Sequence, residues 1–476
     1  MVVQHNMQAA NANRMLNVTT SAQSKSTEKL SSGYRINRAA DDAAGLTISE
    51  KMRKQIKGLD RASTNAEDGV SAVQTAEGAL TEVHSMLQRM NELATQSANG
   101  TNSNTDRKAI QDEIDQLTTE IDRVSETTKF NETYLLKGDG ADKAHNVNAH
   151  DAGIDGVTLT DKGDKVDVTL KELKAGDKIS IAGKNYTIGG TSDDVDNLLK
   201  AANITGAVDN KVTINGTEYT YYDKASDGKT ALDKAGFYAT QPTAAKKDTK
   251  PDYADLDAIK NAKNSTITAG GKSVTTMGNV VDGVDDKDSS VITAKKAYML
   301  ETAEILKASG IGADKAPTAT GNDALDAATN KFSLTKGKVN YNDALSFNLH
   351  VGADADMTNK ITVNIDSMNS AGLGVKGIKA DTEQDATYAI DAIADAISTV
   401  SSQRSALGAV QNRLEHTINN LDNVVENTTS AESRIRDTDM AEEMVNYSKN
   451  NILAQAGQSM LAQANQSNQG VLSLLQ

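Results

Sequence analysis

Apolar side chains recur at steps of three and four residues along much of the first 140 residues. The stripe consists of Met52, Ile56, Leu59, Ala66, Val70 and Val73, and it continues after a three-residue skip with Ala76, Leu80, Val83, Leu87, Met90 and Ala94. This spacing is typical of a coiled-coil seam. At about 1.5 Å per residue, roughly fifty helical residues extend ~75 Å. Thr47 and Glu50 have the spacing of a capping box, which predicts the start of this helix.

A polar run at 99–105 interrupts the stripe. Its Asn, Gly, Thr and Ser residues are typical of a loop, and Thr105 or Asp106 is expected to cap the helix that follows. The next seam contains Ile110, Ile114, Leu117, Ile121 and Val124. We therefore expect two antiparallel helices joined by this loop.

A third long seam occupies the last hundred residues. It contains Ile390, Ile393, Ile397, Val400, Leu407, Val410, Leu414, Ile418, Leu421 and Val425. Seams that lie so far apart in the chain form one bundle if the two ends pack together.

The outermost segments carry opposite charge and few large apolar residues. Residues 1–40 hold five basic side chains and one acidic one, whereas residues 437–476 hold four acidic and one basic. Opposite charge favours pairing of the two ends. Because helices with sparse apolar faces gain stability mainly from a partner, we expect both segments to be poorly ordered alone and helical in an assembly.

The middle of the chain changes to patterns of period two, which predict strands. Residues 212–219 form an expected hairpin, with Asn215 and Gly216 in a type I′ turn. Alternation also marks Val166, Val168 and Leu170; Ile179 and Ile181; Tyr186 and Ile188; and Phe347, Leu349 and Val351 facing Ile361, Val363 and Ile365. Short helices are expected around 194–201 and 291–308. The three prolines and eight of the twelve tyrosines lie in this central part. The predicted fold class is α+β, with a helical coiled-coil stem built from both termini and a β-rich central insert.

Composition narrows the possible functions. The chain has 476 residues, 3% aromatic residues and no Trp, which argues against one large globular core. The net charge of -15 lacks the cationic footprint of a nucleic-acid-binding protein. Without cysteine there are no disulfides or thiolate sites. No apolar run approaches a membrane span, and the N-terminus lacks the apolar region of a cleavable signal peptide, so we expect any export to spare the N-terminus.

The sequence offers no catalytic or metal-binding motif. His145 and His150 are five residues apart, and no His-Glu-x-x-His pattern occurs. The acidic cluster of Asp285, Asp286 and Asp288 lacks the glycine and glutamate of an EF-hand. We therefore predict no catalytic residue, no metal and no cofactor, and we interpret the acidic cluster as a solvated turn.

Both ends carry longer motifs. Residues 30–53 read LSSGYRINRAADDAAGLTISEKMR, residues 121–131 read IDRVSETTKFN, residues 407–416 read LGAVQNRLEH, and residues 433–443 read SRIRDTDMAEE. In this order, they closely resemble the conserved ends of bacterial flagellins. The resemblance covers about half of the chain and excludes its middle.

The resemblance implies a subunit that is exported unfolded with an export chaperone and adds beneath a cap to a homopolymeric, extracellular flagellar filament for motility. It divides the chain into an inner helix (1–44), a stem segment (45–140), an outer β-rich part (141–375), a second stem segment (376–436) and a second inner helix (437–476). Leu453, Leu461, Leu472, Leu474 and Leu475 are expected to make assembly contacts. Junction proteins would be further partners, whereas nucleic acid and membrane insertion are not expected.

The resemblance also suggests recognition by a host. Residues 87–96 are similar to the segment that the Toll-like flagellin receptor contacts, and Arg89, Leu93 and Glu113 match the main contact positions. The alternative interpretation of Arg89 and Glu92, three residues apart, is an ordinary exposed ion pair.

Two other functions remain open on the sequence. A hook–filament junction protein would share the terminal architecture. Alternatively, a stem of this kind could carry an adhesive outer domain in residues 141–375.

Overall fold

The computed structural model describes residues 6–243 and 253–475, with side chains described for 6–243 and 254–467. Within it, the chain forms two compact units. The terminal unit combines Met1–Gln74, Phe347–Val363 and Leu407–Gln476, and the central unit combines Thr75–Ser346 and Asn364–Ala406. The five-segment division expected from the sequence stays a prediction, because each of these units combines parts of several segments.

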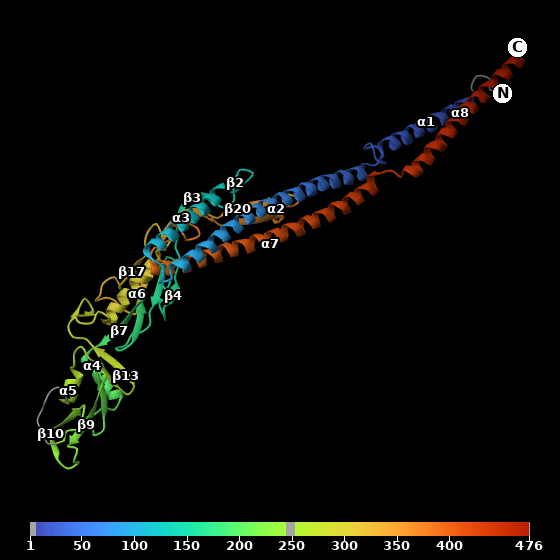
Figure 1. Ribbon diagram of the computed structural model, residues 1–476. Helices are drawn as coiled ribbons and strands as arrows, with labels where there is room; N and C mark the ends of the chain where they lie inside the picture. Colours follow the sequence, from blue (N-terminus) through green and yellow to red (C-terminus); the bar gives the residue numbers. More distant parts are fainter. Residues whose placement is uncertain (1–5, 244–252, 476) are drawn as a thin grey trace. The chain divides into compact units, whose positions relative to one another are not determined.

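Five long helices come from the two ends of the chain (Figure 1). They are α1 (Met7–Ser32), α2 (Ala43–Ser97), α3 (Asn104–Thr127), α7 (Glu383–Arg436) and α8 (Met440–Leu475). The described central region adds three shorter α-helices and one 3-10 turn, namely α4 (Ser192–Ala201), α5 (Leu256–Lys260), α6 (Ala294–Ala308) and η1 (Met357–Asn359). The predicted seams are thus confirmed as helices, and α4 and α6 lie where short helices were expected.

In the terminal unit, α2 and α7 pack through the predicted seams. Ala66 and Leu414 are fully buried against Ile361 of β21 (Lys360–Ile365), whose partner strand is β20 (Leu345–His350). The partly buried side chains around them are Val70, Leu349, Val351, Val410 and Ile418. The expected pairing of these two strands is confirmed.

The beginning of α2 differs from the prediction. The helix starts at Ala43, and the Asp42 carboxylate accepts a hydrogen bond from the Gly45 backbone N–H at 2.9 Å. Thr47 instead donates its hydroxyl to the Ala43 carbonyl inside the first turns. The capping box predicted at Thr47 and Glu50 is therefore wrong, and Asp42 caps the helix.

The helical part of the central unit contains the last turns of α2, all of α3 and the first turns of α7. Its core is made by side chains that have almost no exposed surface, namely Leu80, Val83, Leu87, Met90, Ile114, Ile121, Ile393 and Val400. The expected cap of α3 at Thr105 or Asp106 is wrong. Ser103 caps the helix, and Asp106 completes the capping box as its third residue.

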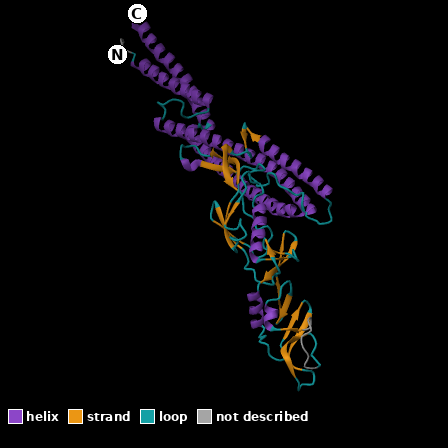
Figure 2. Cartoon of the chain, turned by 90° about the vertical axis from the view of Figure 1, so that its left-hand side faces the viewer, coloured by secondary structure: helices purple, strands orange, loops and turns teal. Residues whose placement is uncertain are grey.

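The strands form one large sheet and several small ones (Figure 2). The large sheet has the order β11-β10-β9-β8-β12-β13-β7-β16-β15-β14, and β6 also pairs with β7. Its strands are β6 (Lys178–Ile181), β7 (Lys184–Gly190), β8 (Lys211–Ile214), β9 (Thr217–Lys224), β10 (Ala231–Tyr238), β11 (Tyr253–Ala254), β12 (Thr266–Ala269), β13 (Lys272–Thr276), β14 (Val280–Val281), β15 (Val284–Asp285) and β16 (Val291–Ile292). The four-stranded sheet orders β17 (Thr318–Thr320), β18 (Lys331–Thr335), β5 (Lys165–Thr169) and β4 (Thr158–Asp161), while β19 (Lys338–Asp343) pairs with β3 (Asp139–Asn146) and β1 (Lys129–Phe130) with β2 (Thr133–Tyr134).

The β-rich part contains two separate hydrophobic cores. One lies among β5, β7, β18 and α6 and includes Val168, Leu334 and Ile305. The other, which includes Leu199 and Phe237, lies where α4 packs on β7, β12 and β13. The predicted hairpin is confirmed as β8–β9, because Ile214 pairs with Thr217 and the two turn residues have φ of 49° and 83°. The fold class is α+β, as predicted.

Candidate functional site

The first candidate site is the terminal pair, which consists of α1 and α8. Asn6 caps α1 by accepting a hydrogen bond from Ala9 at 2.9 Å, and Gly33 ends it with φ 76°. Asp439 accepts from the Ala441 N–H at 2.9 Å and from the Glu442 N–H at 3.1 Å at the start of α8. Polar residues at these positions satisfy the free N–H groups of a helix end, and the left-handed φ at the end of α1 suits glycine.

The two helices of the terminal pair run antiparallel. Asn6 Nδ2 donates to the Ala464 carbonyl at 3.2 Å near one end, and Lys29 Nζ lies 3.5 Å from a Glu443 carboxylate oxygen at the other. Between them, Gly457 faces Leu16, and a Cβ added at this glycine would lie 3.3 Å from Leu16 Cδ1. The predicted pairing of the ends is confirmed, and among the side chains that the structure describes, the ion pair of Lys29 with Glu443 carries the charge complementarity.

The chain between α1 and α2 lies against the chain between α7 and α8. Arg35 N donates to the Arg436 carbonyl at 2.7 Å, and Thr438 N donates to the Gly33 carbonyl at 3.0 Å. The Tyr34 ring lies 4.9 Å from the Arg436 guanidinium, a cation–π distance. The hydrogen bond from Lys25 lowers the pKa of Asp41 to about 2. These contacts hold the segment between α1 and α2 against the segment between α7 and α8.

Much of the apolar surface of the terminal pair is uncovered. Nine large apolar side chains on it are more than two-fifths exposed, namely Met7, Met15, Val18, Met440, Met444, Val445, Ile452, Leu453 and Met460. Val445 and Ile452 are seven residues apart, as are Leu453 and Met460, so each couple forms a stripe along α8. The two stripes are separated by roughly 100° around the helix axis. Apolar side chains on several faces of one helix are typical of a helix that packs in an assembly.

The predicted assembly residues are only partly described. Leu453 is 47% exposed and belongs to one stripe. Leu461 is half-buried on α8. The side chains of Leu472, Leu474 and Leu475 lie outside the described residues.

The second candidate site is the surface where α2 and α3 lie side by side. The Arg89 guanidinium donates from Nε to Glu113 at 2.9 Å and from an η nitrogen to Glu92 at 3.2 Å. The Glu113 carboxylate raises the pKa of Arg89. Leu93 is only 2% exposed and points into the helical core. The structure thus brings two of the three predicted receptor-contact residues together at the surface and buries the third.

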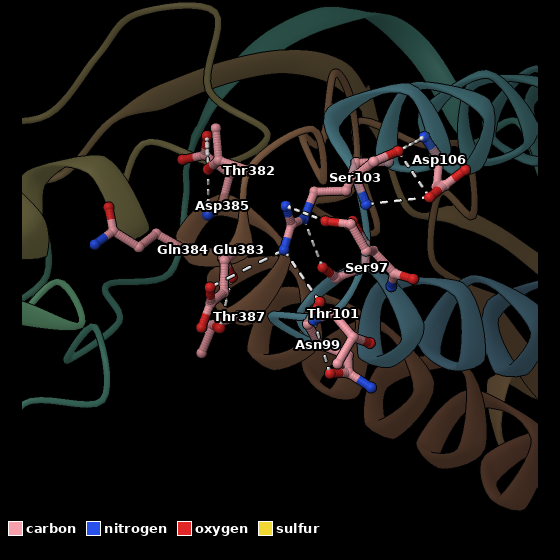
Figure 3. Close-up of polar contacts among 12 residues, drawn as sticks. Ser97, Asn99, Thr101, Ser103, Asp106, Thr382, Glu383, Gln384, Asp385 and Thr387 are labelled. Carbon is pink, nitrogen blue, oxygen red and sulfur yellow. Dashed lines mark hydrogen bonds and ion pairs between the residues drawn. The ribbon is translucent and has the colours of Figure 1, made fainter.

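Residues that the sequence analysis missed hold this surface in place. Arg107 is 7% exposed and donates to three carbonyl oxygens, at 2.9 Å to Ser97 at the end of α2 and, in the α2–α3 loop, at 3.0 Å to Asn102 and 3.1 Å to Asn99. Figure 3 shows Ser97 at the end of α2, Asn99 on the loop that follows and Glu383 on helix α7. Because four carbonyls at a helix end lack intrahelical partners, a buried guanidinium here closes the end of α2.

Gln111 makes a second clamp, to the segment before α7. Its Nε2 donates to the Ile378 carbonyl at 2.9 Å, and its Oε1 accepts from the Ala380 N–H. One feature of the sequence points to both residues. Arg107 and Gln111 are four residues apart, so they lie on the same face of α3, next to the apolar seam of Ile110 and Ile114.

The described residues hold no candidate metal centre. Among them, no group of three His, Cys, Asp or Glu side chains could hold a metal ion. The Asp285 carboxylate accepts from the backbone N–H groups of Gly278, Lys287 and Asp288, so it organises its own turn. His145 stacks on Tyr341 at 4.0 Å between ring centroids. In the described part of the chain, none of the helices has the length and apolar character that a membrane crossing needs.

Comparison with known proteins places both helical ends in one family. The description "Bacterial flagellin N-terminal helical region" matches residues 3–141, and "Bacterial flagellin C-terminal helical region" matches residues 390–475. A flagellin of Clostridium tyrobutyricum is 40% identical over 98% of this chain and 100% of its own length. Flagellin C of Vibrio cholerae is 34% identical, covering 99% of each chain, and a flagellin of Salmonella typhimurium is 34% identical over 97% of this chain and 96% of its own.

Proposed function

This chain belongs to the bacterial flagellin family, and on that premise we propose that its copies polymerise through the terminal pair into the flagellar filament, an extracellular appendage. The family is one of structural proteins, and self-assembly into a polymer is its shared property. The observation that carries the proposal is the uncovered apolar surface of α1 and α8.

The distribution of that surface favours a polymer over a closed dimer. Helix α1 covers the side of α8 that holds Ala454 and Gly457, while the stripes of Val445 with Ile452 and of Leu453 with Met460 stay exposed. One further helix could cover one stripe, so covering both requires more than one neighbour. Contacts between different surfaces of identical subunits propagate as a helical filament unless the rotation closes a ring.

The energies agree with cooperative assembly. Full burial of a large apolar side chain contributes about 1.5–3 kcal/mol, so nine half-exposed ones contribute roughly 10 kcal/mol per subunit. Association of two bodies costs about 4–15 kcal/mol in lost freedom. A single contact with one neighbour therefore binds weakly, whereas several neighbours in a lattice bind firmly.

Membership in the family suggests further partners. We include in the proposal an export chaperone and a filament cap that handle the uncovered terminal pair before and during assembly, and a junction protein at the base of the filament. The full-length similarity to flagellins favours the filament subunit over the junction protein itself. An adhesive role of residues 141–375 stays a prediction, and binding of the purified chain to mucin tests it.

Recognition by a Toll-like receptor is also part of the proposal. The exposed pair of Arg89 and Glu113 supports it as a preformed polar contact across α2 and α3. Leu93 supports this contact surface indirectly, because its buried side chain keeps this part of α2 in position. The measurement is binding of the receptor ectodomain to the Arg89→Ala and Leu93→Ala variants, with Arg123→Ala, an exposed arginine paired to Glu120, as the matched control.

The test of assembly compares four proteins seeded with fragments of flagellar filaments and viewed by negative-stain electron microscopy. The full-length chain should form long filaments, and deletion of residues 437–476 should leave a folded monomer. A double substitution on one stripe, Val445→Ser with Ile452→Ser, should also stay monomeric. The matched control replaces two exposed valines of β14, Val280→Ser with Val281→Ser, and should polymerise normally. Filaments from the truncated chain would refute the proposal.

A further inference from the structure

The exposed methionines of the described residues are concentrated on the terminal pair. Met7 and Met15 on α1 are 66% and 59% exposed, and Met440, Met444 and Met460 on α8 are 48%, 55% and 60% exposed. Met357 in η1 is 75% exposed and lies outside the terminal pair. Met90 and Met368 are fully buried.

The thioether sulfur of methionine is a nucleophile that peroxides oxidise when they can reach it. We propose that hydrogen peroxide modifies the five methionines of the terminal pair. Their oxidation to sulfoxides stops an unassembled subunit from entering the filament. This inference rests on the proposed function, because it takes the terminal pair as the polymerising surface.

The chemistry needs peroxide alone. A sulfur lone pair attacks one oxygen of hydrogen peroxide, the S–O bond forms and the O–O bond breaks. Sulfur is oxidised by two electrons, the peroxide is reduced to water, and the products are methionine sulfoxide and one water molecule. Sulfoxide reductases reverse the reaction, so the block is reversible.

The effect on assembly follows from where the sulfur atoms lie. In the monomer they face water, so a polar sulfoxide costs little there. In the filament the same atoms enter an apolar interface, where a sulfoxide oxygen without a donor is costly to bury. Conversion of methionine to its sulfoxide disrupts methionine-rich interfaces in this way.

The same geometry separates free subunits from assembled ones. A methionine exposed only because its apolar partner is missing becomes covered once the neighbouring subunits dock. Oxidation therefore marks subunits before assembly and spares those already in the filament. Met357 reacts in the free subunit as well, but without consequence for polymerisation, because it is not part of the terminal pair.

The experiment treats full-length monomer with hydrogen peroxide, maps sulfoxides by peptide mass spectrometry and then measures elongation from filament seeds. The five terminal-pair methionines and Met357 should gain oxygen, while Met90 and Met368 should not. Seeded elongation should become at least about tenfold slower, and incubation with a sulfoxide reductase should restore it. Oxidised monomers that elongate at the untreated rate would overturn the inference.

Matched variants separate the terminal pair from the rest of the chain. A quintuple variant with leucine at the five terminal-pair positions should elongate equally fast before and after peroxide. Met357→Leu should remain as sensitive as the unmodified chain. Equal loss of elongation in the quintuple variant after peroxide would contradict the proposal.

A second measurement does not depend on variants. Monomer that is only partly oxidised is seeded, and the filaments are separated from free subunits by sedimentation. Sulfoxides at the five positions should be depleted from the filaments, whereas Met357 sulfoxide should be equal in both fractions. Equal distribution at all six positions would refute the inference while leaving assembly intact. Untreated protein that never elongates would instead refute the proposed function.

Discussion

Replacement of Arg107 by alanine should open the end of α2 and loosen the α2–α3 surface. The guanidinium donates to the carbonyls of Ser97, Asn99 and Asn102 at 2.9–3.1 Å and is almost fully buried. A hydrogen bond from a charged donor contributes about 1.5–3 kcal/mol when its acceptor stays buried, and less when water can replace it. Ser97 is fully buried, whereas Asn99 is exposed and Asn102 half-buried. The expected loss is therefore about 3 kcal/mol, most of it at Ser97.

Amide hydrogen exchange followed by mass spectrometry measures this loss locally. A local measurement is needed because a chain with two compact units does not unfold in one step. Peptides from the last turns of α2 and the first turns of α3 should exchange roughly a hundredfold faster, as about 3 kcal/mol implies. Peptides from the β8–β9 hairpin should be unchanged and serve as the internal reference.

The Arg107→Lys variant tests whether the several N–H donors of the planar guanidinium are needed to hold the end of α2. A lysine keeps the charge but cannot donate to three diverging carbonyls at once, so it should give an intermediate loss. Exchange in the alanine variant within about threefold of the unmodified chain would show that the three hydrogen bonds do not hold this end.

Three further predictions concern other parts of the chain. Burial raises the pKa of Glu301 to about 7, so its contribution to stability is present at low pH and is lost as the pH rises from 4.5 through about 7. Amide exchange of the α6 peptides should show a loss of up to about 3 kcal/mol across that range, and Glu301→Gln should abolish this pH dependence. Gly457→Leu should separate α1 from α8 at Leu16 and prevent seeded elongation. Gly408→Ala should elongate normally, because a Cβ added there meets no atom within 4 Å. Gly216→Ala, at φ 83°, should destabilise the β8–β9 hairpin by about 1 kcal/mol in amide exchange and leave filaments intact.

The periodic elements were predictable because their signal is repeated many times along the chain. Each seam of α2, α3 and α7 contains many apolar positions, so a single misplaced residue does not hide the pattern. The Asn215-Gly216 turn was predictable for a different reason, since few residue pairs adopt left-handed φ at two successive positions.

Helix ends were predicted less well. Thr47 with Glu50 has the spacing of a capping box, yet Asp42 is the cap. A Cβ at Gly45 would lie 2.5 Å from Asp42 Oδ2 and 2.8 Å from Ile36 Cδ1, so a larger residue here requires the capping carboxylate and the buried Ile36 side chain to move. The spacing of Thr47 and Glu50 contains no information about these contacts.

The sequence by itself determined the family, the fold class, the long helices and the pairing of the two ends, because these depend on side-chain periodicity and on motifs that are read along one chain. Only the tertiary structure decided which side chains remain exposed on the terminal pair. It also decided that Arg89 donates to Glu113, 24 residues further along the chain, and that Leu93 points inward. Exposure is what remains after all other segments have packed, so no single segment specifies it. The same holds for the clamp of Arg107, whose three acceptors are backbone carbonyls that any sequence would supply.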